Sequence, residues 1–172
     1  MPIIEGAIGA PLQSAGAPGA GTNEVQTITF GGTPTGGTFT LSFDGLTTAA
    51  ISWSATNGTL VSNIDAALEA LTNIGTGGVT TAVGTMTAGI GTITVTFAGG
   101  DVAKTAVSTL GSSSALTGTA PTLAVTETTP GVTQYGKGSP KGSLATDTTN
   151  GKLYINTGTA ASPTWTVVGT QT

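Results

Sequence analysis

The 172-residue chain contains no histidine, no cysteine and no arginine, and it has only four lysines and eight carboxylates. Histidine titrates near neutral pH, cysteine supplies thiolate nucleophiles and soft metal ligands, and arginine forms bidentate contacts with anions. The side chains used most often for catalysis and zinc binding are therefore missing. Without cysteine no disulfide can form, so a packed core must stabilise the fold. These absences favour a structural or binding protein without cofactors over an enzyme.

Charge is also scarce, since 7% of the residues are charged and the net charge is -4. Binding to nucleic acid draws on clustered Lys and Arg, so nucleic acid is not an expected partner. Low charge suits burial between copies, because the cores of interfaces are depleted in charged residues. The sequence has no run of about 18 uninterrupted apolar residues and no basic N-terminal region before an apolar stretch. We therefore expect neither a membrane span nor a signal peptide.

The first 24 residues differ in composition from the rest of the chain. They carry Pro2, Pro11 and Pro18 with repeated glycine, and they show no sustained period of 2 or 3.6. The pattern predicts an extended N-terminal arm over residues 1–24. Its apolar anchors for a partner would be Ile3, Ile4, Ile8 and Leu12, and packing of the arm on the chain's own domain is an open alternative.

A β-rich domain is predicted for residues 25–130, where Val, Ile, Phe and Thr alternate between Gly-rich turns. The TPTGG segment at residues 33–37 is typical of a turn, so the first two strands are expected to form a hairpin. Residues 101–110 fit neither period, so a short helix and an irregular strand both stay open. Strands are predicted at residues 25–30, 38–43, 47–54, 78–83, 92–97 and 121–129.

One helix is predicted within this domain, over about residues 59–74. A polar start suits capping, and Gly75 is placed to end the helix. Asp65 and Glu69 lie off the apolar stripe and are expected to face water. The stripe consists of Leu60, Ile64, Leu68 and Leu71.

A linker is predicted at residues 131–141, followed by a three-stranded β unit at residues 142–172. Asn150-Gly151 is a strong hairpin signal, and Tyr154 and Trp165 are expected to pair across this unit. So small a sheet needs something to cover its apolar face. Strands are expected at residues 143–148, 152–157 and 163–168. The chain as a whole is thus predicted to be mainly β, of the α+β type, with an antiparallel sheet domain and one packed helix.

No pattern of catalytic or metal-binding residues stands out. The acids are scattered singly, and Asp44 and Asp147 occupy predicted turns, where Asp favours local hydrogen bonds. No calcium-binding or phosphate-binding loop is present. The aromatic residues raise the alternative of a sugar-binding platform, with Tyr135 in the linker as its best candidate. Core or interface contact is favoured over that alternative, and Trp53 is expected in the core.

Two segments resemble modules of tailed-bacteriophage structural proteins. The run VQTITFGGTPTGGTFTLSFDGLTTAAISWSATNGTLVSNIDAALEALTNIG is similar to a domain that recurs in such proteins, and the likeness extends over residues 25–97. The C-terminal run GSLATDTTNGKLYINTGTAASPTWTVVG looks like a module common at the ends of phage head-fibre, decoration and tail-fibre proteins.

The resemblance implies a virion component without enzymatic activity. The negative charge and the arm favour a capsid decoration or minor capsid protein on the outside of a phage head, made in the host cytoplasm. Its partners would be the major capsid protein and copies of itself, for example as a trimer. Alternatives are a tail, baseplate or fibre component, and a carbohydrate-binding adhesion module. The predicted partner-binding residues are Ile3, Ile4, Ile8, Leu12, Tyr135, Tyr154 and Trp165.

Overall fold

The computed structural model describes residues 12–14 and 17–169, which are mainly β with antiparallel sheets and a single helix, as the sequence predicts. The chain divides into two compact units. The central unit is formed by Gly21–Thr133. The terminal unit is formed by the described residues of both chain ends, up to Ala20 and from Gln134 onward. Each unit is described by itself below.

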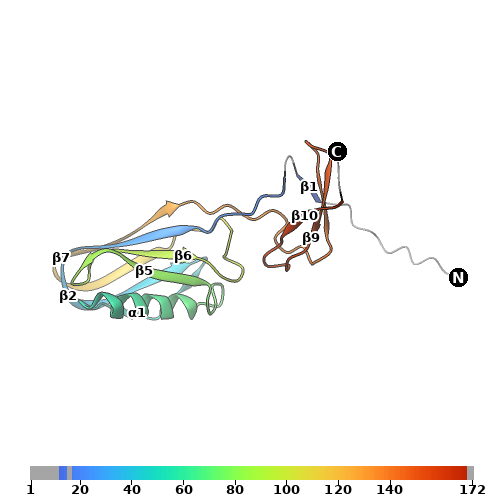
Figure 1. Ribbon diagram of the computed structural model, residues 1–172. Helices are drawn as coiled ribbons and strands as arrows, with labels where there is room; N and C mark the ends of the chain where they lie inside the picture. Colours follow the sequence, from blue (N-terminus) through green and yellow to red (C-terminus); the bar gives the residue numbers. More distant parts are fainter. Residues whose placement is uncertain (1–11, 15–16, 170–172) are drawn as a thin grey trace. The chain divides into compact units, whose positions relative to one another are not determined.

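Two long strands organise the central unit (Figure 1). Strand β2 (Val25–Phe43) pairs along its length with β7 (Gly111–Thr129). The first part of β2 also pairs with β6 (Ile90–Phe97), which pairs with β5 (Val79–Thr87). The second part pairs with two short strands, β4 (Ile51–Ser52) and β3 (Leu46–Thr47).

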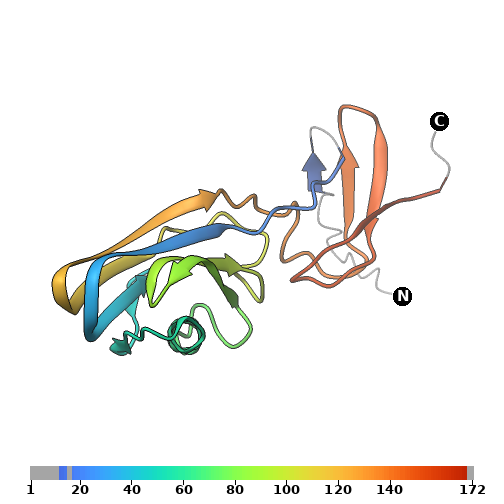
Figure 2. The ribbon, with the colours of Figure 1, turned by 60° about the vertical axis from the view of Figure 1, so that its left-hand side comes forward.

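The predicted hairpin turn at residues 33–37 is wrong, because β2 continues through TPTGG as one bent strand (Figure 2). Its register with β7 shifts between Gly31 and Thr33 and between Pro34 and Gly36. Gly37 has a φ of 91°, and a Cβ there would lie 2.4 Å from the carbonyl oxygen of Ala115. The glycines therefore bend a strand pair that stays hydrogen-bonded on both sides of the bend.

The bend brings the two parts of β2 together around one core. Phe30 and Phe39 meet edge to face with centroids 5.2 Å apart. Phe43, at the end of β2, stacks on Phe97 of β6 with centroids 5.3 Å apart. Phe97 directly follows Thr96, which is opposite Val25 at the start of β2. The end of β2 thus packs over the sheet that contains its own beginning.

The helix α1 spans Asn57–Glu69, so the prediction of residues 59–74 extended it too far. After Glu69 the chain forms irregular turns, in which the N–H of Leu71 donates to Leu68 and that of Ile74 to Leu71. Both Leu71 and Ile74 stay buried, which explains why the apolar stripe continued beyond the helix. No side-chain hydrogen bond caps its N-terminus. The face that packs on the sheet is formed by Leu60, Ile64 and Leu68.

Helix α1 is hydrogen-bonded to both neighbouring outer strands. An Asp65 carboxylate oxygen accepts from the N–H of Thr81 in β5 (3.2 Å) and from its hydroxyl (2.9 Å). The side-chain amide of Asn63 donates to the carbonyl oxygen of Ser52 in β4 (3.0 Å). Glu69 accepts from the N–H of Gly77 (2.7 Å). Asp65 and Glu69, expected to face water, are thus half-buried and bonded to neighbouring segments.

Residues 101–110 contain turns and irregular backbone rather than a helix or a strand. The buried side chains of Glu24 and Gln26 hold the end of this segment. Glu24 accepts from the N–H of Val107 (2.8 Å), while Gln26 accepts from that of Leu110 (2.8 Å) and donates to the Ser108 carbonyl (3.0 Å). The side chains of Glu24 and Gln26 make the hydrogen bonds that a neighbouring strand would otherwise make. The segment therefore shows neither the period of a strand nor that of a helix.

The terminal unit is a four-stranded sheet in the order β1-β8-β9-β10. The three C-terminal strands are close to those predicted: β8 (Leu144–Asp147), β9 (Lys152–Asn156) and β10 (Trp165–Val167). The fourth, β1 (Leu12–Ser14), lies parallel to β8 and comes from residues predicted to be an extended arm. The segment from Gln134, predicted as linker, also belongs to this unit.

Candidate contact surfaces of the terminal unit

Three chain segments meet around Trp165. The rings of Trp165 and Tyr135 lie edge to face with centroids 5.9 Å apart, and the indole N–H donates to the Tyr135 carbonyl oxygen (3.0 Å). A Cβ on Gly136 would lie 2.6 Å from the Trp165 ring and 3.2 Å from a methyl group of Leu12. Leu12, Tyr135 and Trp165 therefore form one cluster, which we call the Trp165 cluster.

Polar side chains fix the loops on either side of this cluster. Asn156 is opposite Trp165 in the sheet and is buried. Its amide oxygen accepts from the N–H groups of Gly158 and Thr164 (both 2.9 Å), and its nitrogen donates to the Ser139 carbonyl (2.7 Å). Asn156 was not predicted from the sequence, although it lies two residues after Tyr154 in the same strand and so on the same buried face.

The structure brings together only some of the predicted partner-binding residues. Leu12, Tyr135 and Trp165 meet as described, whereas Tyr154 is opposite Val167 and not opposite Trp165. The predicted pairing of Tyr154 with Trp165 is therefore wrong. Ile3, Ile4 and Ile8 lie outside the described residues.

The two tyrosines of the terminal unit do not offer their rings as open platforms. Tyr154 is buried, and the hydroxyl oxygen of Tyr135 is buried with no hydrogen-bond partner among the described residues. Burial raises the pKa of Tyr135 above its usual range. The edge of Trp165 is occupied by Gly136 and by the hydrogen bond to Tyr135. This arrangement gives the Trp165 cluster a packing role.

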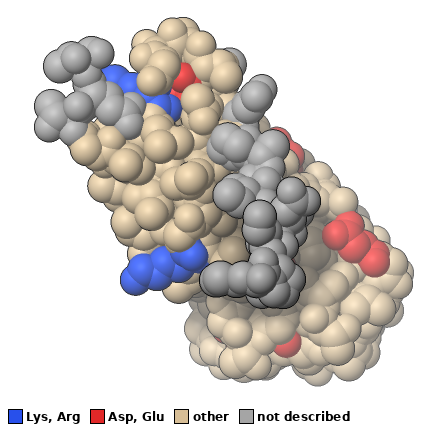
Figure 3. Space-filling view, turned by 90° about the vertical axis from the view of Figure 1, so that its right-hand side faces the viewer, with Lys and Arg blue, Asp and Glu red and all other residues tan. Residues whose placement is uncertain are grey.

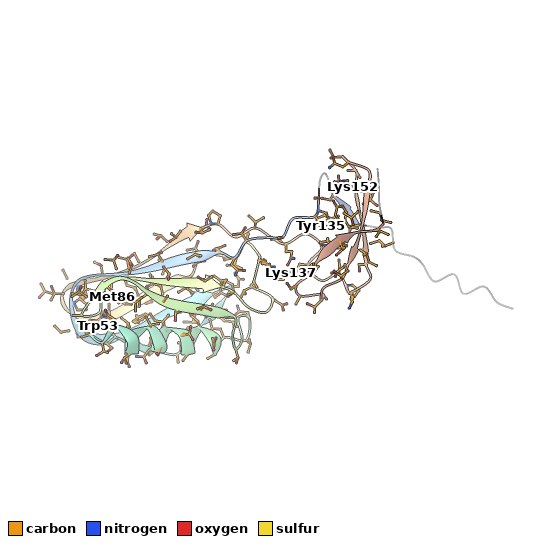
Figure 4. All side chains as sticks on the ribbon, in the orientation of Figure 1. Trp53, Met86, Tyr135, Lys137 and Lys152 are labelled. Atoms are coloured by element: carbon orange, nitrogen blue, oxygen red, sulfur yellow. The ribbon has the colours of Figure 1, made fainter. Side chains whose placement is uncertain are left out.

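Trp53, in the central unit, is half-buried and packs against the core, as does Met86 (both are labelled in Figure 4). Its indole N–H donates to the carbonyl oxygen of Gly89 (3.2 Å), and the N–H of Gly89 donates to Asn57 (2.9 Å). Trp53 and Asn57 thus hold the turn between β5 and β6.

The second face of the terminal sheet carries a partly open group of apolar side chains, and Thr146 and Thr166 lie on the same face. Alternation along β8 and β9 puts Leu144, Leu153 and Ile155 on the face opposite the buried Ala145 and Tyr154. Leu144 is 40% exposed, and Leu153 and Ile155 are half-buried. We call these three residues the Leu144 face. Its composition fits contact with another apolar surface.

Asp147 stabilises the turn next to this face. Its carboxylate accepts from the side-chain amide of Asn150 (2.8 Å), from the N–H of Asn150 (3.0 Å) and from that of Thr149 (2.9 Å). These bonds, with a smaller effect of the charge on Lys152, outweigh burial and lower the pKa of Asp147 below its usual range. The carboxylate therefore serves the β8–β9 turn.

The described residues show no other arrangement that indicates chemistry. No group of three or more Asp or Glu side chains gathers there as a metal ion would require. No described helix is both long enough and apolar enough to cross a membrane. On the face seen in Figure 3, charged side chains are few and most of the surface is uncharged.

No protein-family model matches the chain, and no curated protein matches it either.

Proposed function

We propose that this chain is a non-enzymatic structural protein of a tailed bacteriophage, a decoration or minor capsid protein that binds the outer surface of the head. The two sequence modules that resemble phage proteins support this proposal. The observation that carries it is the Leu144 face, a partly open group of three apolar side chains on a small sheet that contains residues from both chain ends. A sheet of this size gains stability when such a face is covered.

The partner of the Leu144 face is the major capsid protein in its assembled state. A protein that binds the shell but not free subunits stabilises the shell by linkage, without any reaction. The residues before β1, with Ile3, Ile4 and Ile8, would add contacts to neighbouring capsid subunits. The same modules would serve a tail, baseplate or fibre protein. The carbohydrate-binding alternative draws less support, because the indole N–H of Trp165 bonds within the chain and Tyr154 is buried.

A matched pair of variants tests the role of the Leu144 face. Leu144→Lys adds a charge to this face, whereas Leu46→Lys adds the same charge to a residue of similar exposure (39%) on β3 of the central unit. Co-sedimentation with heads that lack the protein measures binding. We expect the affinity of Leu144→Lys to fall at least about tenfold, since an unpaired charge would be buried at the contact. Leu46→Lys should bind like the unmodified chain.

Equal binding of both variants would rule out the Leu144 face as the contact. Deletion of residues 2–11 tests the arm separately, because it leaves β1 in place. A loss of occupancy on the heads is expected if the arm contributes contacts, and unchanged occupancy would remove the arm from the proposal.

A further inference from the structure

The outer strands of the central sheet differ in whether side chains of other elements hydrogen-bond to their outer edges. On β5, the N–H of Thr81 is bonded to Asp65 of α1, and on β4 the carbonyl of Ser52 is bonded to Asn63 of α1. Backbone groups at these edges are thus already occupied. Proteins commonly block sheet edges in this way, because free edges pair with other chains.

Strand β7 has no comparable cover. It pairs only with β2, and none of its 19 residues is buried. Within the described part of the chain, its backbone is hydrogen-bonded only to β2, apart from the N–H of Leu116, which donates to the hydroxyl of Ser114 in β7 itself (3.4 Å). One edge of a long strand is therefore left without a partner inside its own unit.

The composition of β7 does not discourage pairing. Glu127 is the only charged residue of the strand, and its single proline, Pro121, is at the bend. Lysines and inward-pointing charges, which usually protect an edge, are missing from it. Residues 122–129 (TLAVTETT) contain four Thr and one Val, which favour a strand, whereas residues 111–114 (GSSS) favour a strand less. The part after the bend is the better edge for pairing.

The register shows which backbone groups point outward. The N–H of Phe97 donates to the carbonyl of Glu24, so every second residue of β2 from there turns its backbone toward β6. Thr27 and Thr29 therefore turn theirs toward β7, where they are opposite Thr126 and Ala124. By the same alternation, the N–H and C=O groups of Leu123 and Val125 point away from β2.

We propose that a second copy of this chain pairs along this edge, β7 against β7, antiparallel about a two-fold axis at Ala124. An antiparallel edge is self-complementary under such an axis, and Leu123 of each copy would bond to Val125 of the other. The two Ala124 methyl groups would face each other without a clash. No charged side chain lies at residues 111–126, so two chains of net charge -4 can meet there without opposed like charges. The pairing does not depend on the proposed function.

Sedimentation equilibrium of the full chain tests this pairing, from about 1 μM to about 1 mM. Ala124→Lys and Ala124→Glu each place like charges opposite each other at the axis, and each should weaken dimerisation at least about tenfold. An equal mixture of the two variants should recover a dimer, because unlike charges then face each other. Ala82→Lys is the control, since Ala82 is an exposed residue of the covered edge strand β5.

Val125→Pro is a second test that does not depend on charge. It removes an N–H that points away from β2, so the pairing with β2 should be kept and thermal unfolding should still be cooperative. This variant should also be monomeric. The pairing is overturned if the unmodified chain stays monomeric or forms a trimer throughout this range. Dimerisation of Ala124→Lys or of folded Val125→Pro with unchanged affinity would overturn it as well.

Discussion

At the level of single residues, Glu24 and Gln26 make hydrogen bonds that a neighbouring strand would make in a regular sheet. Both are buried next to an irregular segment, and together they satisfy the N–H groups of Val107 and Leu110. A polar residue at the first position of a β pattern is easily taken for a solvent-facing one. The sequence shows the alternation, but the partners are more than 80 residues away along the chain.

Replacing Gln26 with leucine should therefore destabilise the central unit. Gln26 is 0% exposed, and its loss leaves the Leu110 N–H and the Ser108 carbonyl without their partner. We expect the free energy of unfolding to fall by at least about 2 kcal/mol, measured by urea denaturation. Thr80→Leu, at an exposed position on β5, should change it by less than about 0.5 kcal/mol. A Gln26→Leu variant as stable as the original would contradict this role.

Asp147 should make the stability of the terminal unit depend on pH. Its folded-state pKa is lowered, so its stabilising effect is fully present above the unfolded pKa and is lost as the pH falls through the folded value. The midpoint temperature of thermal unfolding should therefore fall when the pH is lowered below about 4. This decrease should be larger in the original chain than in Asp147→Asn.

Trp165 fluorescence in a Trp53→Phe background follows the terminal unit in this experiment, since Trp53 belongs to the central unit. Asp44→Asn, in a turn of the central unit, should keep the acid dependence of the original terminal unit. An unchanged dependence in Asp147→Asn would show that other groups cause it.

At the level of elements, the sequence predicted the helix and the turn that follow from local patterns. It did not predict features that depend on pairing between strands far apart in the chain. The stripe Leu60, Ile64 and Leu68 identified the helix, and Asn150-Gly151 identified the turn between β8 and β9. The TPTGG segment has the composition of a turn, yet β7 pairs across it and keeps β2 continuous. Residues 111–120 (GSSSALTGTA) showed no strand signal because small and polar residues dominate them, and Leu116 is their only half-buried side chain. Leu12, Tyr135 and Trp165 were each predicted from the sequence as partner-binding residues. The sequence could not show that they form one cluster.

The bend of β2 makes a specific demand on Gly37. Its φ is 91°, and a Cβ would approach the Ala115 carbonyl oxygen to 2.4 Å. Gly37→Ala should therefore lower the free energy of unfolding by about 2 to 3 kcal/mol in a denaturant titration. Gly58→Ala is the matched control, because no atom lies within 4 Å of a Cβ at this helical position. Equal stability of the two variants would mean that the bend tolerates a side chain.

At the level of the whole molecule, the two units divide the proposed tasks. The terminal unit joins residues from both chain ends and carries the Leu144 face, which we propose as the contact with a phage head. The central unit is stabilised by its own core and carries the uncovered edge of β7. Scarce charge suits both tasks, because each depends on burying uncharged surface.

The most direct test of the proposed function is an electron micrograph of intact particles that carry a labelled copy of this chain. The chain has no cysteine, so Thr72→Cys, at an exposed position after α1, provides a single thiol for a gold label. We predict gold on the outer surface of the head, in many copies per particle. Gold on the tail or baseplate alone, or particles without gold, would contradict the assignment to the head.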